Sequence, residues 1–240
     1  MAELQFTGYR TLGKYGQVGL GPFGRTVDID RTDGRFTADD SFPHPEQVGN
    51  SYREAGIHAF LNVQHTDNNT NPTRGVKWKN QLTLHQEVGG TENQLARLSS
   101  EFSIYLTPTW PRFQPTLAIR AGVASNVGDY KFFQAQSIGN LVNLRRFRRN
   151  RFAGRTLAYQ NLDLRIPFFK LSAYVFKGNG GFLAFADQGR VWLDGEQSNT
   201  WHRSVGPGIW FNFYGFAVIS ATYAFSPEEN LFTIQGGFFF

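Results

Sequence analysis

Apolar and polar side chains alternate along most of the chain. In residues 74–88, Val76, Trp78 and Leu84 alternate with lysines and other polar residues. Because successive side chains of a strand point to opposite faces, this period of two predicts β-strands with one apolar and one polar face. The predicted strands are residues 15–29, 52–65, 74–88, 94–107, 115–125, 156–167, 181–192, 203–213, 216–226 and 231–240, and residues 4–10 have the character of the end of an eleventh.

The length of these strands favours a membrane barrel. Strands in soluble domains usually have about 5–6 residues, whereas a tilted strand needs about 9–11 to cross a bilayer. The polar faces carry charges of both signs mixed with Gly, Ser and Thr, as the wall of a water-lined or plugged lumen would. A soluble β-sandwich also alternates and is the competing interpretation. We predict an all-β transmembrane antiparallel β-barrel of about 10–12 strands, with residues 1–240 forming a single outer-membrane domain without a periplasmic domain.

The connections between the predicted strands alternate in length. Long or polar links are predicted at residues 30–51, 125–155 and 193–202, and shorter ones at 66–73, 108–114 and 214–215. Bacterial barrels place short turns in the periplasm and long loops outside. They also have even strand numbers, so an eleventh strand implies that residues 1–10 are periplasmic or that the N-terminal part of the barrel is incomplete in this chain.

Composition narrows the alternatives further. The chain has 240 residues, of which 16% are aromatic and 26 are Gly, and it carries a net charge of +5. It contains no Cys, which excludes disulfides and thiolate metal sites. The aromatic content argues against disorder, and no apolar run reaches the 18 residues of a spanning helix. No signal-peptide pattern is recognisable at Met1.

Three motifs resemble one family, the BamA-type outer-membrane assembly and two-partner-secretion transporter superfamily, also described as the bacterial surface antigen barrel. Leu144-Arg145-Arg146-Phe147, in the long loop, is similar to the V-R-G-F/Y loop of that superfamily. A predicted strand carries Phe185, Asp187 and Gly189, which resemble its F-x-D-x-G element. A short turn resembles its D…N…P-x-R-G periplasmic turn through Asp67, Asn69, Pro72, Arg74 and Gly75.

The end of the chain is similar to the C-terminal signal of outer-membrane proteins in general. Phe232, Ile234, Phe238 and Phe240 fall on alternate positions that lead to a terminal Phe. Taken alone this feature is less specific than the loop and strand motifs, but all four features together cover the chain from about residue 15 to residue 240.

The resemblance implies a role for the loop. The long extracellular loop folds back into the lumen, where its Arg pairs with the Asp on the barrel wall; by position these are Arg145 and Asp187. A guanidinium is the natural bidentate partner of a carboxylate that is partly desolvated. Arg146 stands where the family has Gly, so either Arg145 or, with the register exchanged, Arg148 takes the Arg position.

The resemblance also implies a location and an activity. It places the protein in the outer membrane of a Gram-negative bacterium and implies insertion, assembly or translocation of proteins through a barrel seam between first and last strands. The implied partners are outer-membrane lipid and unfolded outer-membrane proteins. Two alternatives stay open: a membrane-anchoring barrel or subunit, completed as a homodimer or by a partner chain, whose activity lies in a missing N-terminal domain or in that partner, and a passive pore.

Other candidate chemistry is weaker. Five of the seven residues 145–151 are Arg; lumen docking, contact with anionic lipid and nucleic-acid binding are the alternatives, and stacking aromatics for a nucleic acid are not concentrated beside them. The remaining arginines are expected to pair with acids such as Glu54, Glu87, Glu101 or Asp163. A G-x-G-x-x-G match at residues 19–24 lacks a following helix, and the five His lack metal-ligand spacing. We therefore predict a protein that is not an enzyme, with no catalytic residue, metal or cofactor.

Overall fold

The computed structural model describes residues 2–30, 44–89, 94–109, 114–139, 142–145, 152–172, 177–195, 199–215, 217–225 and 230–240. Nearly all of its regular structure is antiparallel β. The strands are β1 (Ala2–Gln5), β2 (Gly8–Leu12), β3 (Gly16–Asp28), β4 (Ser51–Thr66), β5 (Gly75–Glu87), β6 (Gln94–Leu106), β7 (Thr116–Gly128), β8 (Gln136–Ile138), β9 (Phe152–Gly154), β10 (Thr156–Ser172), β11 (Lys177–Trp192), β12 (His202–Phe213), β13 (Ala217–Ala224) and β14 (Leu231–Gly236). Two short 3₁₀ turns, η2 (Pro45–Gln47) and η3 (Phe132–Gln134), lie in the loops.

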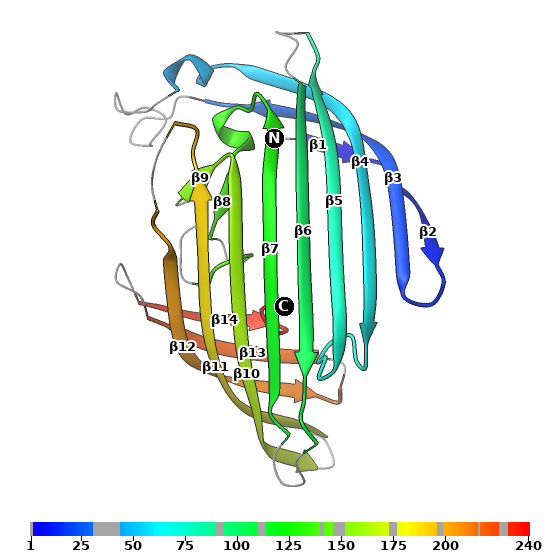
Figure 1. Ribbon diagram of the computed structural model, residues 1–240, viewed down its shortest axis with the longest axis vertical. Helices are drawn as coiled ribbons and strands as arrows, with labels where there is room; N and C mark the ends of the chain where they lie inside the picture. Colours follow the sequence, from blue (N-terminus) through cyan, green and yellow to red (C-terminus); the bar gives the residue numbers. More distant parts are fainter. Residues whose placement is uncertain are drawn as a thin grey trace.

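Twelve of the described strands form one sheet (Figure 1). Its order is β3, β4, β5, β6, β7, β10, β11, β12, β13 and β14, with β1 and β2 both along the outer edge of β3. β1 pairs with the second half of β3 and β2 with the first half, so the two are segments of a single edge row. The sheet therefore has eleven rows, in agreement with ten predicted strands and the end of an eleventh. The predicted all-β, antiparallel barrel class is confirmed, although the barrel is not closed.

The sheet coils around an interior space. Figure 1 shows β4 to β7 running along the long axis, whereas β12 to β14 cross that direction steeply. The twist between neighbouring strands adds up across the sheet and produces this curvature. Within the described ranges, no ladder joins β14 to β1 or β2, so both edges of the sheet are open.

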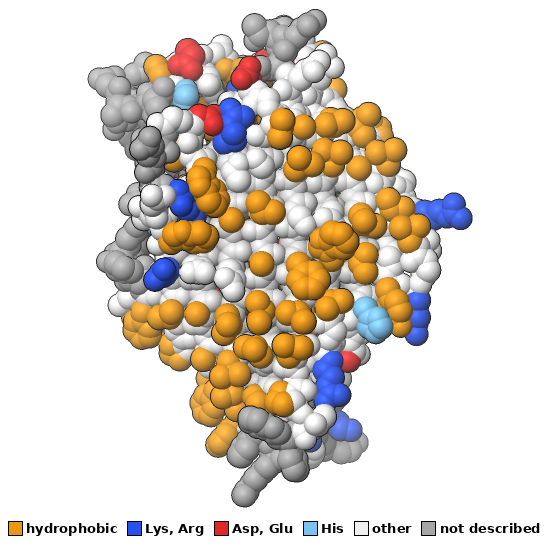
Figure 2. Space-filling view, viewed as in Figure 1, with side chains coloured by type: hydrophobic (Ala, Val, Ile, Leu, Met, Phe, Trp, Pro, Cys, Tyr) orange, Lys and Arg blue, Asp and Glu red, His pale blue; other side chains and the backbone are white. Residues whose placement is uncertain are grey.

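The distribution of side chains is inverted relative to a soluble protein. On the outer face, Ile57, Leu84 and Val123 are 49%, 45% and 48% exposed. On the inner face, Asn161 and Asp163 are fully buried. Figure 2 shows hydrophobic side chains spread over the outer face of the sheet. Buried polar groups and exposed apolar ones are what a barrel needs when lipid surrounds it and water or a plug fills it.

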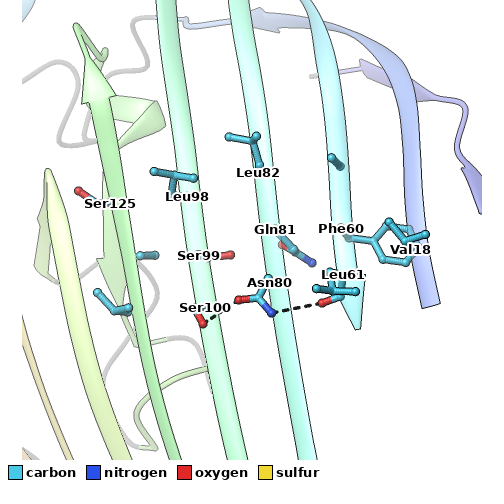
Figure 3. Close-up of a pocket in the computed structure, with 13 residues that line it drawn as sticks. Val18, Phe60, Leu61, Asn80, Gln81, Leu82, Leu98, Ser99, Ser100 and Ser125 are labelled. Atoms are coloured by element: carbon cyan, nitrogen blue, oxygen red, sulfur yellow. Dashed lines mark hydrogen bonds between the residues drawn. The ribbon is translucent and has the colours of Figure 1, made fainter. Parts of the chain in front are cut away.

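A shallow hollow on the outer face contains polar side chains (Figure 3). The Ser100 hydroxyl donates to the Asn80 side-chain oxygen at 2.9 Å, and the Asn80 amide donates to the Leu61 carbonyl at 3.4 Å. The Trp78 indole N–H donates to Ser100 at 3.1 Å. These groups satisfy one another, as polar groups facing hydrocarbon must.

Most predicted strand limits agree with the observed ones within a few residues, and three differences stand out. β10 continues to Ser172 and β11 begins at Lys177, so this hairpin is longer than predicted. The long loop contains a small hairpin, β8–β9, that the alternation did not predict. The predicted strand 231–240 is wrong at its end, because β14 stops at Gly236. In the described residues no helix is long and apolar enough to cross a membrane.

Candidate functional site: an arginine cluster inside the sheet

The long loop between β7 and β10 returns to the inner face of the sheet. Its hairpin β8–β9 contacts β7, β10 and β11. Ile138 and Leu144 are fully buried and pack with Leu157 of β10. A Cβ on Gly189 would lie 2.5 Å from the Leu144 Cδ1, so Gly189 provides the space that Leu144 occupies. The apolar anchor thus fixes the loop immediately before Arg145.

Arg145 binds two carboxylates in the interior. Its Nε donates to Asp187 Oδ2 at 2.8 Å and its Nη2 donates to Asp187 Oδ1 at 2.7 Å, a bidentate pair. The same Nη2 donates to Asp163 Oδ1 at 2.6 Å. Burial alone would lower the pKa of the Arg145 guanidinium, but the charges and hydrogen bonds of Asp163 and Asp187 raise it. Arg145 is therefore a permanent charge that links the loop to β10 and β11.

Neighbouring groups complete the arrangement around Asp187. The backbone N–H of Arg145 donates to Asp187 Oδ2 at 3.2 Å, and Ser204 donates to the Arg145 carbonyl at 3.1 Å. The Asn161 amide donates to Asp187 Oδ1 at 2.9 Å and to the Asn143 carbonyl at 2.8 Å. The Phe185 ring lies 3.9 Å from the Arg145 Cζ. Side chains from three strands, β10, β11 and β12, thus hold Arg145 in one position.

The end of the chain enters the same interior. Gly237 has a φ of +90°, and there the backbone leaves β14 and turns inward. The Phe238 ring lies 3.7 Å from the Arg165 Cζ, and the Phe239 ring lies 4.4 Å from the Arg145 Cζ. Arg165 also donates to the Phe240 carbonyl at 3.0 Å. Phe238 and Phe240 thus do not continue the outward-facing series, whereas Phe232 and Ile234 are 60% and 65% exposed.

The predicted turn is an ordered unit at one end of the sheet. Asp67 Oδ1 accepts from the backbone N–H groups of Asn68, Thr73 and Arg74, at 3.0, 2.9 and 3.1 Å. Pro72 is fully buried, and its carbonyl accepts from the Arg165 guanidinium at 3.5 Å. Burial tends to raise the pKa of Asp67, but these hydrogen bonds and that of the Thr73 hydroxyl outweigh it, so the pKa lies below its ordinary value.

Two further members of this turn have local roles. Gly75 has a φ of +117°, and a Cβ there would lie 2.0 Å from the His65 carbonyl oxygen, so only Gly fits. The Asn69 side-chain oxygen accepts from the Gln64 amide at 2.9 Å.

Five of the residues predicted for the loop and strand motifs lie together in the structure. The structure brings Leu144, Arg145, Phe185, Asp187 and Gly189 together, and it is Arg145 that binds Asp187. Arg146, Phe147 and Arg148 lie outside the described residues.

Of the acids expected to pair with other loop arginines, Asp163 binds Arg145 itself. Glu54 binds Arg25, and Glu87 binds Lys131. Glu101 binds Lys79 and lies near Arg120. These acids are therefore satisfied mainly by residues of the barrel wall and by Lys131 of the loop.

The comparison with known proteins decides the family. The model of the Omp85 superfamily domain matches residues 8–240. The chain belongs to the Omp85 superfamily. This is a family of bacterial outer-membrane proteins for protein insertion and secretion, whose members are transporters or insertases rather than enzymes. No curated protein matches this chain.

Sequence reasoning missed several residues that this Omp85 chain uses to hold the loop. Arg120 donates through Nε to Asn161 at 2.8 Å and through Nη2 to the Val142 carbonyl at 2.9 Å. Asn161, Asp163 and Arg165 occupy alternate, inward positions of β10. Their inward direction follows from the alternation, but their proximity to Asp187 depends on the register between β10 and β11. Among the described residues, no cluster of His, Asp and Glu is suited to hold a metal ion.

Proposed function

We propose that this Omp85 chain forms an outer-membrane β-barrel domain, residues 1–240, that assists the insertion, assembly or translocation of other proteins through the seam of the barrel. The observation that carries this proposal is the open seam between β1–β2 and β14. Unpaired backbone groups at a sheet edge are costly in hydrocarbon and pair readily with another strand. An open edge therefore offers an incoming polypeptide its backbone hydrogen bonds.

The β14 side is the weaker side of this seam. β14 has six residues, fewer than the roughly 9–11 needed to cross a bilayer. A Cβ on Gly236 or Gly237 would contact nothing within 4 Å, so the strand is loosely packed where it ends. On the other side, Leu4 and Phe6 are 72% and 70% exposed. Both edges thus present apolar, accessible surface to a partner.

The loop is assigned the role of a plug. Arg145 and Asp187 fix it across the interior, and the rings of Phe185 and Phe239 cover the guanidinium. A plug of this kind would prevent free diffusion through the lumen while the seam changes. We propose Asp67, Asn69, Pro72, Arg74 and Gly75 as a structural periplasmic turn, and the terminal Phe residues as an assembly signal.

Cross-linking tests the seam. The chain has no Cys, so a Leu4→Cys, Ile234→Cys pair can be joined by a flexible bismaleimide without competing reactions. The matched control is Ala59→Cys with Leu82→Cys, which are already partners in β4 and β5. Proteoliposomes holding the protein are then given an unfolded outer-membrane protein. We expect the seam cross-link to abolish the gain in client folding rate and the control to leave it unchanged; full activity of the cross-linked seam would contradict the proposal.

The number of rows favours a second candidate, a barrel completed by another chain. All neighbouring rows are antiparallel, so in an eleven-row sheet the first and last rows run in the same direction. Direct closure would require a parallel pair, whereas one added strand would restore an antiparallel ladder throughout. That strand would come from a partner chain, a second copy or a segment outside residues 1–240.

Sedimentation in detergent distinguishes the two candidates. A partner-completed barrel predicts a stable complex that contains a second polypeptide or a second copy. A monomer in which Cys residues introduced at Leu4 and Ile234 form a disulfide on oxidation would contradict it.

A further inference from the structure

Charge is distributed unequally between the two ends of the sheet. Basic side chains collect at the end with the short turns: Arg10, Lys14, Arg74, Lys77, Lys79, Lys170 and Lys177. Of the described carboxylates there, Asp67 is used within its own turn. Figure 2 shows acidic side chains mainly at the opposite, upper end, whereas basic ones occur at both ends and along the sides. Among the described residues, the short-turn end therefore carries more basic than acidic side chains.

A polar cavity of about 410 Å³ opens at this end. Three of the lysines, Lys14, Lys77 and Lys79, line it. Lys79 forms an ion pair with Glu101, with 3.1 Å between Nζ and Oε1. In the described part of the chain no carboxylate pairs with Lys77, whose Nζ lies 5.2 Å from the centre of the Tyr105 ring. The other polar lining side chains are neutral: Thr11, Tyr15, Gln17, Asn62, Gln64 and Asn69.

The register places this cavity on the inner face of the sheet. Asn62 is the partner of Lys79, and Gln64 is the partner of Lys77, so these side chains share one face. That face is opposite to the one with Leu61 and Val63. The Asn62 side-chain oxygen is buried and has no hydrogen-bond partner among the described residues. Lys77 and Lys79 therefore face the mouth of the lumen and not the surrounding lipid, and Lys14 lies in the β2–β3 turn at the rim of the cavity.

We propose that this mouth binds an acidic segment of a polypeptide. Lys14 and Lys77 would meet its carboxylates, while the side-chain amides of Gln17 and Asn62 would meet its backbone. The cavity includes the β2–β3 turn, so it adjoins the open edge at which a chain could pair. A lipid headgroup fits less well, because Lys77 and Lys79 point away from the outer face. This inference rests on the proposed function only in taking the acidic segment to be part of a client protein. Binding of an acidic peptide at the mouth does not itself require insertion activity.

Fluorescence titration tests the proposal. The probe is a dansyl-labelled twelve-residue peptide of alternating Glu and Ser, and its Gln/Ser analogue is the control; both are added to the folded protein in neutral detergent. The variants are Lys14→Gln, Lys77→Gln and the pair together. Arg53→Gln is the matched control, because it removes the same charge from an exposed position near the other end of β4. Circular dichroism verifies that each variant is folded.

We expect saturable binding of the Glu/Ser peptide that weakens with salt, as exposed charge pairs do. Each single variant should weaken it about threefold and the double variant about tenfold, while Arg53→Gln changes it less than about twofold. Three results would overturn the proposal: equal binding of the Gln/Ser peptide, undiminished binding by the double variant, or binding of short-chain phosphatidylglycerol in place of the peptide. If the unmodified protein binds the Glu/Ser peptide but does not promote client insertion, the proposed function is contradicted and the peptide-binding proposal is not.

Discussion

Arg145 is the residue on which the loop most depends. It is 2% exposed and compensates two carboxylates that are themselves buried, Asp163 and Asp187. The cost of a buried ion pair is largest when one partner is removed, because the other charge then has no compensation. The surrounding hydrogen bonds from Asn161 and Ser204 fix the position of the loop but cannot replace a positive charge.

Substitution of Arg145 by Met is therefore expected to destabilise the protein by about 3–5 kcal/mol. Urea unfolding in detergent, followed by circular dichroism, measures the change. Arg155→Met is the control, since Arg155 pairs with the exposed Asp194 in a loop. The free energy of unfolding of the control should fall much less. Equal losses in the two variants would mean that the buried pairing of Arg145 contributes no more than the exposed pairing of Arg155.

Gly189 is a second residue with a definite prediction. Substitution by Val places side-chain atoms where Leu144 packs, because even a Cβ would lie 2.5 Å from its Cδ1. The loop anchor should then be displaced and the peptide bonds of residues 142–145 should become accessible to protease. Gly24→Ala is the control, because its nearest contact, the Glu54 carbonyl oxygen, would lie at 4.0 Å. Unchanged proteolysis of Gly189→Val would contradict the assigned role.

At the scale of elements, the Asp67 turn gives a pH prediction. The pKa of Asp67 is lowered in the folded protein because the carboxylate accepts several hydrogen bonds. The turn is therefore stabilised fully above the ordinary value of 3.8 and loses that stabilisation as pH falls through the lowered value. The stability difference between the wild type and Asp67→Asn should shrink between pH 6 and pH 2. A difference that stays constant over this range would exclude the ionised carboxylate as the cause.

The strands themselves were largely predictable. Alternation places Leu82 and Leu84 on one face and Thr83 and His85 on the other without reference to any partner. The end of β14 could not be predicted, because Gly237 permits both a continued strand and an inward turn. The contacts of Phe238 with Arg165 and of Phe239 with Arg145 decide between the two. The β8–β9 hairpin depends in the same way on packing against β10 and β11.

The site was predictable in part for a related reason. The resemblance identified Arg145 and Asp187, but it did not give Asp163, Asn161 or Arg120. Those residues become neighbours through the registers of β7, β10 and β11, where Arg120, Asn161 and Asp187 lie side by side. Register is set by packing across the whole sheet and cannot be derived from one strand.

At the scale of the whole molecule, charged and polar side chains face the interior of the sheet and apolar side chains face outward. The interior holds Arg145, Arg165 and Asp163 at 2% exposure or less, while the outer face keeps residues such as Leu98 and Phe102 nearly half exposed. This is stable only if hydrocarbon replaces water on the outside. The proposed client pairing at the seam, the proposed plug and the proposed binding of an acidic peptide all depend on that orientation.

Site-directed labelling of β5 in lipid bilayers tests this orientation most directly. Single Cys substitutions at residues 80 to 86 each carry a nitroxide, and collision with oxygen and with a water-soluble nickel chelate is measured. Leu82 and Leu84 should be accessible to oxygen in the lipid, whereas Thr83 and His85 should be shielded from it. Equal oxygen accessibility at all positions, or the opposite alternation, would contradict the account.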